Sequence, residues 1–163
     1  SLRRRGLEGE VVSTVGPGNW RVIYAITKFQ PMVSIVIPTA GKDASIRGKN
    51  INLLCNCIQS IQNHAGYDNY EFVVIENGDL SDSTLEYLNT LDNLNLVRYN
   101  SPKFNLAEKI NIGVDAAKGD FILLLNDDTE AITPNFMGNM LGLASIEGAS
   151  FNSRSSKYFS YYS

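Results

Sequence analysis

The sequence has few of the residues that build disulfide frameworks or zinc sites. It contains two cysteines and one histidine in 163 residues. Cys55 and Cys57 lie two positions apart on a predicted helix, where such side chains do not face each other, so they cannot form a disulfide together. This small number of cysteines fits a protein in the reduced environment of the cytoplasm better than one with disulfide bonds or a zinc site. A peripheral association with the membrane is compatible with this location.

Long hydrophobic runs and an excess of positive charge are also missing. No apolar stretch approaches the roughly 20 residues of a transmembrane segment, and the amino-terminal residues lack the apolar core of a signal peptide. The formal net charge of -3 argues against a nucleic-acid-binding surface. Residues 39–49 do not form a phosphate-binding loop, because the spacing of Gly41 and Gly48 is wrong and Asn50 replaces the Ser or Thr that would hold Mg²⁺.

The sequence does contain apolar runs that alternate with amphipathic segments. Strands are predicted at residues 33–37, 72–75, 96–99 and 121–125, and helices at about 50–64 and from about residues 83, 105 and 133. The expected sheet-facing positions of the third helix are Leu106, Ile110, Val114 and Ala117. Such a succession predicts one α/β domain with a mainly parallel sheet and helices on both faces. In the commonest strand order the fourth strand lies beside the first, and ligands bind at this switch point, at the carboxyl ends of the strands.

The chain is divided into a lead-in segment at residues 1–30, the domain at 31–149, and a tail at 150–163. Within the lead-in, residues 20–26 alternate weakly and are interpreted as an edge strand or a segment lying on the domain. The sequence does not begin with Met, which suggests a processed or excised piece of a longer protein.

Polar residues follow three of the predicted strands. Thr39 follows the first, Glu76 and Asn77 end the second, and residues 126–128 (Asn-Asp-Asp) follow the fourth. An isolated Asp-Asp pair is more often a turn than a site. Because three strand ends carry polar groups at the same edge, however, the sequence favours a site here, and hard cations such as Mg²⁺ and Mn²⁺ prefer carboxylate oxygens.

Four segments together resemble family 2 glycosyltransferases of the GT-A fold. They are residues 33–39 (VSIVIPT), 70–78 (YEFVVIENG), 104–113 (FNLAEKINIG) and 117–130 (AKGDFILLLNDDTE). The resemblance implies a Rossmann-like nucleotide-sugar domain in which residues 126–128 correspond to the D-x-D motif. Asp128 then takes the position of the ligand to Mg²⁺ or Mn²⁺, and Asn126 replaces the first acid.

The resemblance also implies a set of nucleotide contacts. These are assigned to Pro38, Thr39, Glu76, Asn77, Asn111 and Asp127. For Asn111 a structural hydrogen bond between helix and loop is an equal alternative. Lys109 is interpreted as a solvated helix residue, although it could approach phosphate, and His64 as a helix-end residue.

The function implied by the resemblance is that of an inverting glycosyltransferase. It would transfer a hexosyl-type sugar from a nucleoside diphosphate donor to a glycan or lipid-linked acceptor, in cell-surface polysaccharide synthesis. The general base of the family is expected beyond residue 163, because residues 149–163 contain no acid. The chain is therefore interpreted as a truncated domain that does not transfer sugar by itself. Truncation would leave the fourth strand as an exposed edge and favour self-association.

Two alternatives remain. A non-catalytic nucleotide-binding module would bind the same ligand without turnover. A nucleotidyltransferase on a similar sheet ranks last, because it needs a loop rich in glycine and arginine, and residues 39–49 offer only Arg47.

Overall fold

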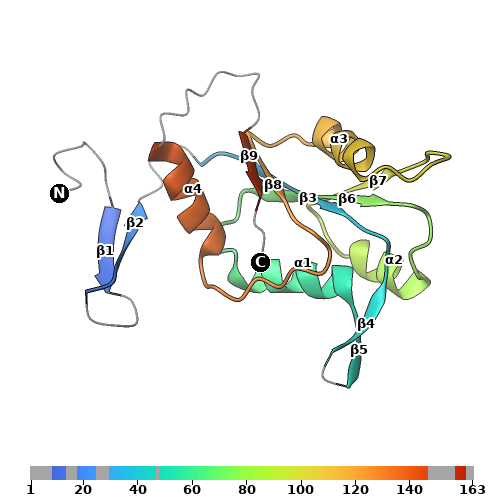
Figure 1. The fold of residues 1–163 in the computed structure, drawn as a ribbon, viewed down its shortest axis with the longest axis horizontal. Helices are drawn as coiled ribbons and strands as arrows, with labels where there is room; N and C mark the ends of the chain where they lie inside the picture. Colours follow the sequence, from blue (N-terminus) through green and yellow to red (C-terminus); the bar gives the residue numbers. More distant parts are fainter. Residues whose placement is uncertain (1–8, 14–17, 25–29, 47, 147–156, 161–163) are drawn as a thin grey trace.

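The computed structural model describes residues 9–13, 18–24, 30–46, 48–146 and 157–160. Their strands form one five-stranded sheet and two hairpins, and their helices cover the larger sheet (Figure 1). The large sheet contains β3 (Val33–Pro38), β6 (Tyr70–Glu76), β7 (Leu94–Arg98), β8 (Phe121–Leu124) and β9 (Lys157–Ser160). The helices are α1 (Leu53–His64), α2 (Asp82–Leu88), α3 (Leu106–Ala116) and α4 (Phe136–Ile146).

The strand order of the large sheet is β7-β6-β3-β8-β9, and every neighbouring pair is parallel. The chain thus moves outward from β3 to β6 and β7 and then returns to place β8 on the other side of β3. This is the order predicted from the sequence, with the switch point between β3 and β8. The expectation that the fourth strand is an exposed edge is wrong, because β9 pairs with β8. Among the described strands the outer ones are β7 and β9.

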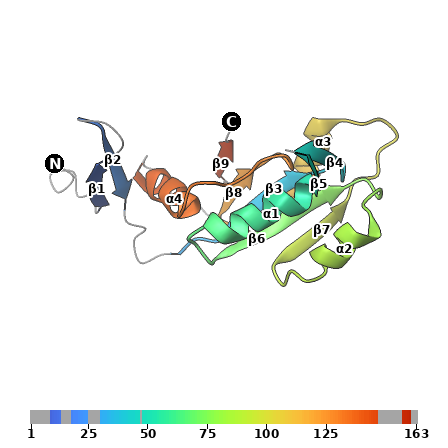
Figure 2. The same ribbon diagram turned by 90° about the horizontal axis from the view of Figure 1, so that it is seen from below.

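The strands bury alternate side chains on the two faces of the sheet. On β3, Val33, Ile35 and Ile37 belong to a cluster with residues of α1, α2 and α4. Val36 belongs to a second cluster that packs against α3. Helices therefore cover both faces, as predicted (Figure 2). Each fully buried aliphatic side chain contributes about 1.5–3 kcal/mol, so these two clusters hold the strand ends in place.

The segment between β3 and α1 differs from its prediction. Residues 39–49 were expected to form a loop, but β4 (Asp43–Ile46) and β5 (Lys49–Asn52) pair as an antiparallel hairpin. Helix α1 consequently begins at Leu53, later than expected, with Asn52 as its N-cap residue. The Asn52 side chain accepts a hydrogen bond from Cys55 N at 3.0 Å, which satisfies one of the free N–H groups of the first turn.

Helix α3 packs Val114 and Ala117 against the sheet, as predicted, but not Leu106. Its N-cap is Asn105, as expected, but Leu106 is 49% exposed. The buried positions are Lys109 and Gly113. A Cβ on Gly113 would lie 2.5 Å from Cδ1 of Ile75, so only glycine allows this close approach of helix and strand.

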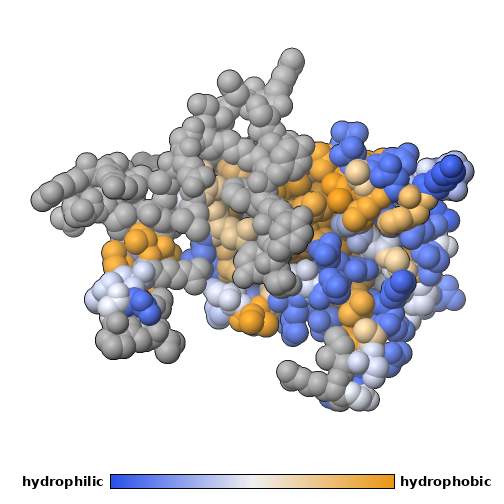
Figure 3. All heavy atoms as spheres, viewed as in Figure 1, coloured by the Kyte–Doolittle hydropathy of each residue, from blue (hydrophilic) through white to orange (hydrophobic). Residues whose placement is uncertain are grey.

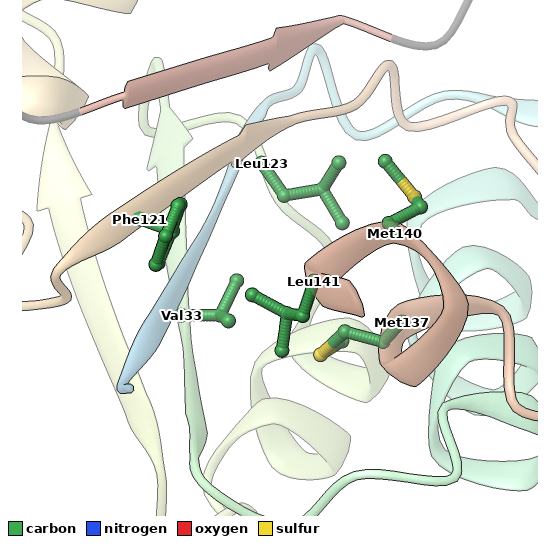
Figure 4. Close-up of a pocket in the computed structure, with 6 residues that line it drawn as sticks. All are labelled: Val33, Phe121, Leu123, Met137, Met140 and Leu141. Carbon is green, nitrogen blue, oxygen red and sulfur yellow. The ribbon is translucent and has the colours of Figure 1, made fainter. Parts of the chain in front are cut away.

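Helix α4 begins at Phe136, slightly later than predicted, and packs its methionines on β3 and β8. Figure 4 shows a small apolar gap at this contact. It is lined by Val33, Phe121, Leu123, Met137, Met140 and Leu141. The gap has a volume of about 10 Å³, at the lower limit for one water molecule, and no polar group lines it. We interpret it as imperfect packing and not as a ligand site.

The amino-terminal hairpin lies outside the large sheet, next to α4 (Figure 1). It consists of β1 (Gly9–Ser13) and β2 (Trp20–Tyr24), so part of the predicted 20–26 segment is a hairpin strand. Residues 25 and 26 are outside the described residues. Trp20 is 67% exposed, and Figure 3 shows hydrophobic surface on this hairpin. No helix in the described part of the chain is long and apolar enough to cross a membrane.

Candidate functional site

The switch point between β3 and β8 is closed by a side-chain hydrogen bond. Thr39, directly after β3, donates its hydroxyl to Oδ2 of Asp127 at 2.6 Å. Thr39 N also donates to Ile75 O of β6 at 2.9 Å, so the same residue is tied to both neighbouring strand ends. The structure thus brings together Thr39 and Asp127, two residues that the sequence places 88 positions apart.

The two adjacent aspartates of the switch point lie in different surroundings. Asp127 is half-buried and engaged by Thr39. Asp128 is exposed, and its carboxylate accepts no hydrogen bond from the residues that the structure describes. Asp127 therefore fixes the loop, whereas the oxygens of Asp128 are available to a ligand.

The loop that carries both aspartates is anchored on α1. Cys57 Sγ lies 3.7 Å from Asn126 O, and Ser60 Oγ accepts from Ala131 N at 2.8 Å. Ser60 Oγ in turn donates to Cys57 O at 2.8 Å. Because these contacts hold both ends of residues 126–131, the position of Asp128 is set by the core.

The exposed carboxylate of Asp128 is the described group at the switch point that could take part in holding a metal ion. In the residues described, no group of three or more His, Cys, Asp or Glu side chains could hold a metal alone. Mg²⁺, however, is commonly bound by one or two carboxylates together with substrate phosphates and water. Asp128 supplies one such carboxylate at the switch point.

Glu76, at the end of β6, is occupied by internal partners. Its buried carboxylate accepts from Arg98 Nη1 at 2.9 Å and also from Gly78 N. Gly78 has a φ of 89°, and a Cβ there would lie 1.5 Å from the Arg98 guanidinium. This glycine is therefore favoured by its backbone conformation, and a Cβ there would displace the Arg98 side chain. Arg98 was not predicted, because nothing in the sequence of β7 marks it.

Lys109 is buried at the centre of the site, and its interpretation as a solvated helix residue is wrong. It is 2% exposed, and its ammonium donates to Thr39 O and, at 2.8 Å, to Asn77 Oδ1. Burial lowers the pKa of Lys109, while the carboxylates of Asp79, Asp127 and Glu76 act in the opposite direction. The burial of Lys109 could have been inferred from its spacing to Gly113. The two residues lie four positions apart, on the same helix face, and Gly113 is the position at which α3 packs closely on the sheet.

The remaining predicted residues lie at different distances from this centre. Pro38 ends β3 opposite Ile75 and is half-buried. Asn111 is exposed on α3. Two helix positions rotate a side chain by about 200°, so Asn111 points away from the face that carries Lys109. The structure does not bring Asn111 to the strand ends, and its role stays a prediction.

The chain is similar in sequence to parts of two longer proteins. The chain is 29% identical over 159 residues to the uncharacterized protein y4gI of Sinorhizobium fredii, covering 89% of this chain and 16% of that protein. It is 26% identical over 145 residues to the O-antigen biosynthesis protein RfbC of Myxococcus xanthus, covering 88% of this chain and 10% of RfbC. The chain thus spans a small fraction of the length of these relatives.

Among solved structures, S. aureus TarS residues 1–349 matches with a TM-score of 0.49 and 18% identity, over 69% of this chain and 31% of that one. The model of the family "Glycosyl transferase family 2" matches residues 34–158, which include all three strand ends of the site and the first half of β9. This match covers well over half of the chain and confirms the resemblance and the GT-A-like fold class expected from it. The chain belongs to glycosyl transferase family 2.

Proposed function

We propose that this chain is the donor-binding part of an inverting glycosyltransferase and holds a nucleoside diphosphate sugar at the β3–β8 switch point. The observation that carries the proposal is the Thr39–Asp127 hydrogen bond, which closes the switch point and leaves the Asp128 carboxylate exposed beside it. In the whole protein the sugar would pass to a glycan or lipid-linked acceptor. The name of the relative RfbC supports a place in surface polysaccharide synthesis.

Each residue of the site has a distinct role in this proposal. Asp127 holds Thr39 and thereby the ends of β3 and β8. Glu76 and its partner Arg98 shape the end of β6, and Asn77 contacts the base. Mg²⁺ or Mn²⁺ bound by Asp128 would neutralise the diphosphate and stabilise it as a leaving group. We place this function in the cytoplasm, with a peripheral association with the membrane left open.

The metal and nucleotide site is tested by calorimetric titration of uridine and cytidine diphosphates, with Mn²⁺ and with a chelator. The wild-type chain should bind at least one of them with strong metal dependence. Asp128→Ala should remove that dependence, because the protein ligand of the bridging cation is lost.

Asp127→Asn is the matched control for this experiment. It should weaken binding by about 10-fold, the size of one charge-assisted hydrogen bond, and should retain the metal dependence. Equal affinity of the wild-type chain with and without metal would contradict the site. Loss of metal dependence in Asp127→Asn as well would contradict the division of roles.

A second candidate function is a nucleotide-binding module without catalysis. It is favoured by one observation, that Glu76 and Asp127 are both engaged by internal partners and neither is free to act as a general base. Binding of the same nucleotide by the whole protein without turnover would support this alternative.

A further inference from the structure

Lys109 differs from the other lysines whose exposure the structure describes. Lys42, Lys49, Lys103 and Lys118 are exposed, whereas Lys109 is 2% exposed. Burying an ammonium group is costly unless it is paired and hydrogen-bonded. A methionine would fill the same space without this cost, so packing alone does not explain a lysine at this position.

The Lys109 ammonium connects two neighbouring strand ends from the α3 side of the sheet. It donates to Thr39 O, after β3, and to Asn77 Oδ1, after β6. The ring of Tyr99 lies on another side, with its centroid 5.8 Å from Nζ. These contacts fix the direction of the ammonium, and through it the orientation of the Asn77 side chain.

The chemistry of the pair decides which end of the Asn77 amide meets the ligand. A lysine ammonium has N–H donors and no acceptor, whereas a carboxamide has one oxygen acceptor and one NH₂ donor group. The amide oxygen must therefore face Lys109, and Nδ2 must point away from it. Asn77 is half-buried, and in the described part of the chain Nδ2 donates to no protein acceptor. This donor group is left for the ligand.

We propose that Lys109 is a positioning residue that turns the N–H groups of Asn77 toward the nucleotide, so that Asn77 selects a hydrogen-bond acceptor on the base. This inference rests on the proposed function, in which Asn77 contacts the base. Cytosine presents an unprotonated ring nitrogen at N3, whereas uracil presents an N–H there. Where Asn77 meets the base at this ring position, and not at one of the carbonyl oxygens that both pyrimidines carry, it favours cytidine over uridine diphosphate. Adenine and guanine differ in the same way at N1.

The test compares the dissociation constants of cytidine and uridine diphosphates, measured by calorimetry with Mn²⁺. The wild-type chain should bind the cytidine nucleotide more tightly. Lys109→Met frees the Asn77 amide to rotate, so the ratio of the two constants should move at least about 3-fold toward unity. Lys118→Met is the matched control, since this exposed lysine lies beyond the far end of α3, and its ratio should equal that of the wild type.

A second variant keeps the test decisive if Lys109→Met fails to fold. Asn77→Asp preserves an oxygen for Lys109 but replaces the N–H donors with a second acceptor. It should shift the ratio toward uridine diphosphate by about 10-fold, the effect of one good hydrogen bond. A general loss of structure would weaken the binding of both nucleotides equally and would not change the ratio of their dissociation constants.

The possible failures are distinguishable. If the wild-type chain binds neither these nucleotides nor guanosine and adenosine diphosphates with Mn²⁺, the proposed function itself is wrong. If it binds them but prefers the base with a ring N–H, the inference about Lys109 and Asn77 is overturned. An unchanged ratio in both Lys109→Met and Asn77→Asp overturns it as well.

Discussion

At the residue scale, neighbours in the sequence acquire different chemistry from their surroundings. Asp127 and Asp128 are adjacent, yet one is bonded to Thr39 and the other is exposed. Both negative charges also act on Cys57, which lies beneath their loop and is fully buried. Burial, followed by the charges of Asp127 and Asp128, raises the pKa of the Cys57 thiol from 9.0 to about 12. The loop and the helix that anchors it are therefore coupled electrostatically as well as by contact.

The thiol provides a prediction about pH. Because its pKa is raised in the folded state, its contribution to stability is complete below about pH 9 and is lost as the pH rises toward 12. In the native chain, alkylation of Cys57 by iodoacetamide should be at least about 100-fold slower at pH 8.5 than in urea, since only the thiolate reacts. Its rate should keep rising well above pH 9.

Mass spectrometry of the variants Cys55→Ser and Cys57→Ser separates the two sites. Cys55 is only partly buried and should react faster than Cys57 in the native chain. A native Cys57 rate that levels off near pH 9 would show that burial does not control this thiol.

At the element scale, β3, β6, β7 and β8 and their order could be predicted from the sequence, because β3, β6 and β8 are mainly apolar and are followed by polar residues. Strand β9 was not predicted. The hairpin β4–β5 could not, since its residues are mostly polar and pair through the backbone. The sheet-facing side of α3 was predicted only in part: Val114 and Ala117 pack on the sheet, but Lys109 was not expected there. The prediction assumed that buried positions are apolar, whereas the structure buries Lys109 against two carbonyl oxygens. Thr39 and Asp127 could be predicted for the site because both follow strands. For Lys109 the signal was only its spacing from Gly113, and nothing in the sequence of β7 marks Arg98.

The close contact of α3 with the sheet leads to a prediction about Gly113. A Cβ there would lie 2.5 Å from Cδ1 of Ile75 and 2.8 Å from Cγ1 of Val36, both in the core. Gly113→Ala should lower the free energy of unfolding by about 1–3 kcal/mol, because overpacking outweighs the better helix propensity of alanine. Urea denaturation measures the change.

The exposed Asp115 on the same helix is the control for this prediction, and Asp115→Ala should stay within about 0.5 kcal/mol of the wild type. Because Lys109 lies one turn before Gly113, Gly113→Ala should also weaken nucleotide binding. Equal or higher stability of Gly113→Ala would mean that α3 can move away from β6 without cost.

At the scale of the whole molecule, the proposed donor site occupies the carboxyl edge of the sheet, and the described residues there include few other groups that could act on an acceptor. The acids at positions 76, 79 and 127 all act on Lys109, so they lie on the nucleotide side. His64 contacts Ser60 O at the end of α1, near the start of β6 and hence at the opposite edge of the sheet. Since the chain spans 16% of one relative and 10% of another, transfer to an acceptor is a property proposed for the whole protein.

The last prediction is that these 163 residues alone bind a donor nucleotide without transferring its sugar. Activation of an acceptor hydroxyl needs a base within hydrogen-bond reach, and its absence costs about 10²–10⁴-fold in rate. An acceptor that is not held in place adds a further loss. A mass-spectrometric screen of sugar nucleotides with pooled glycan and lipid-linked acceptors should detect no multiple turnover, while calorimetry on the same sample detects binding. Metal-dependent turnover would contradict this prediction, and Glu130→Gln would then show whether this exposed acid supplies the base.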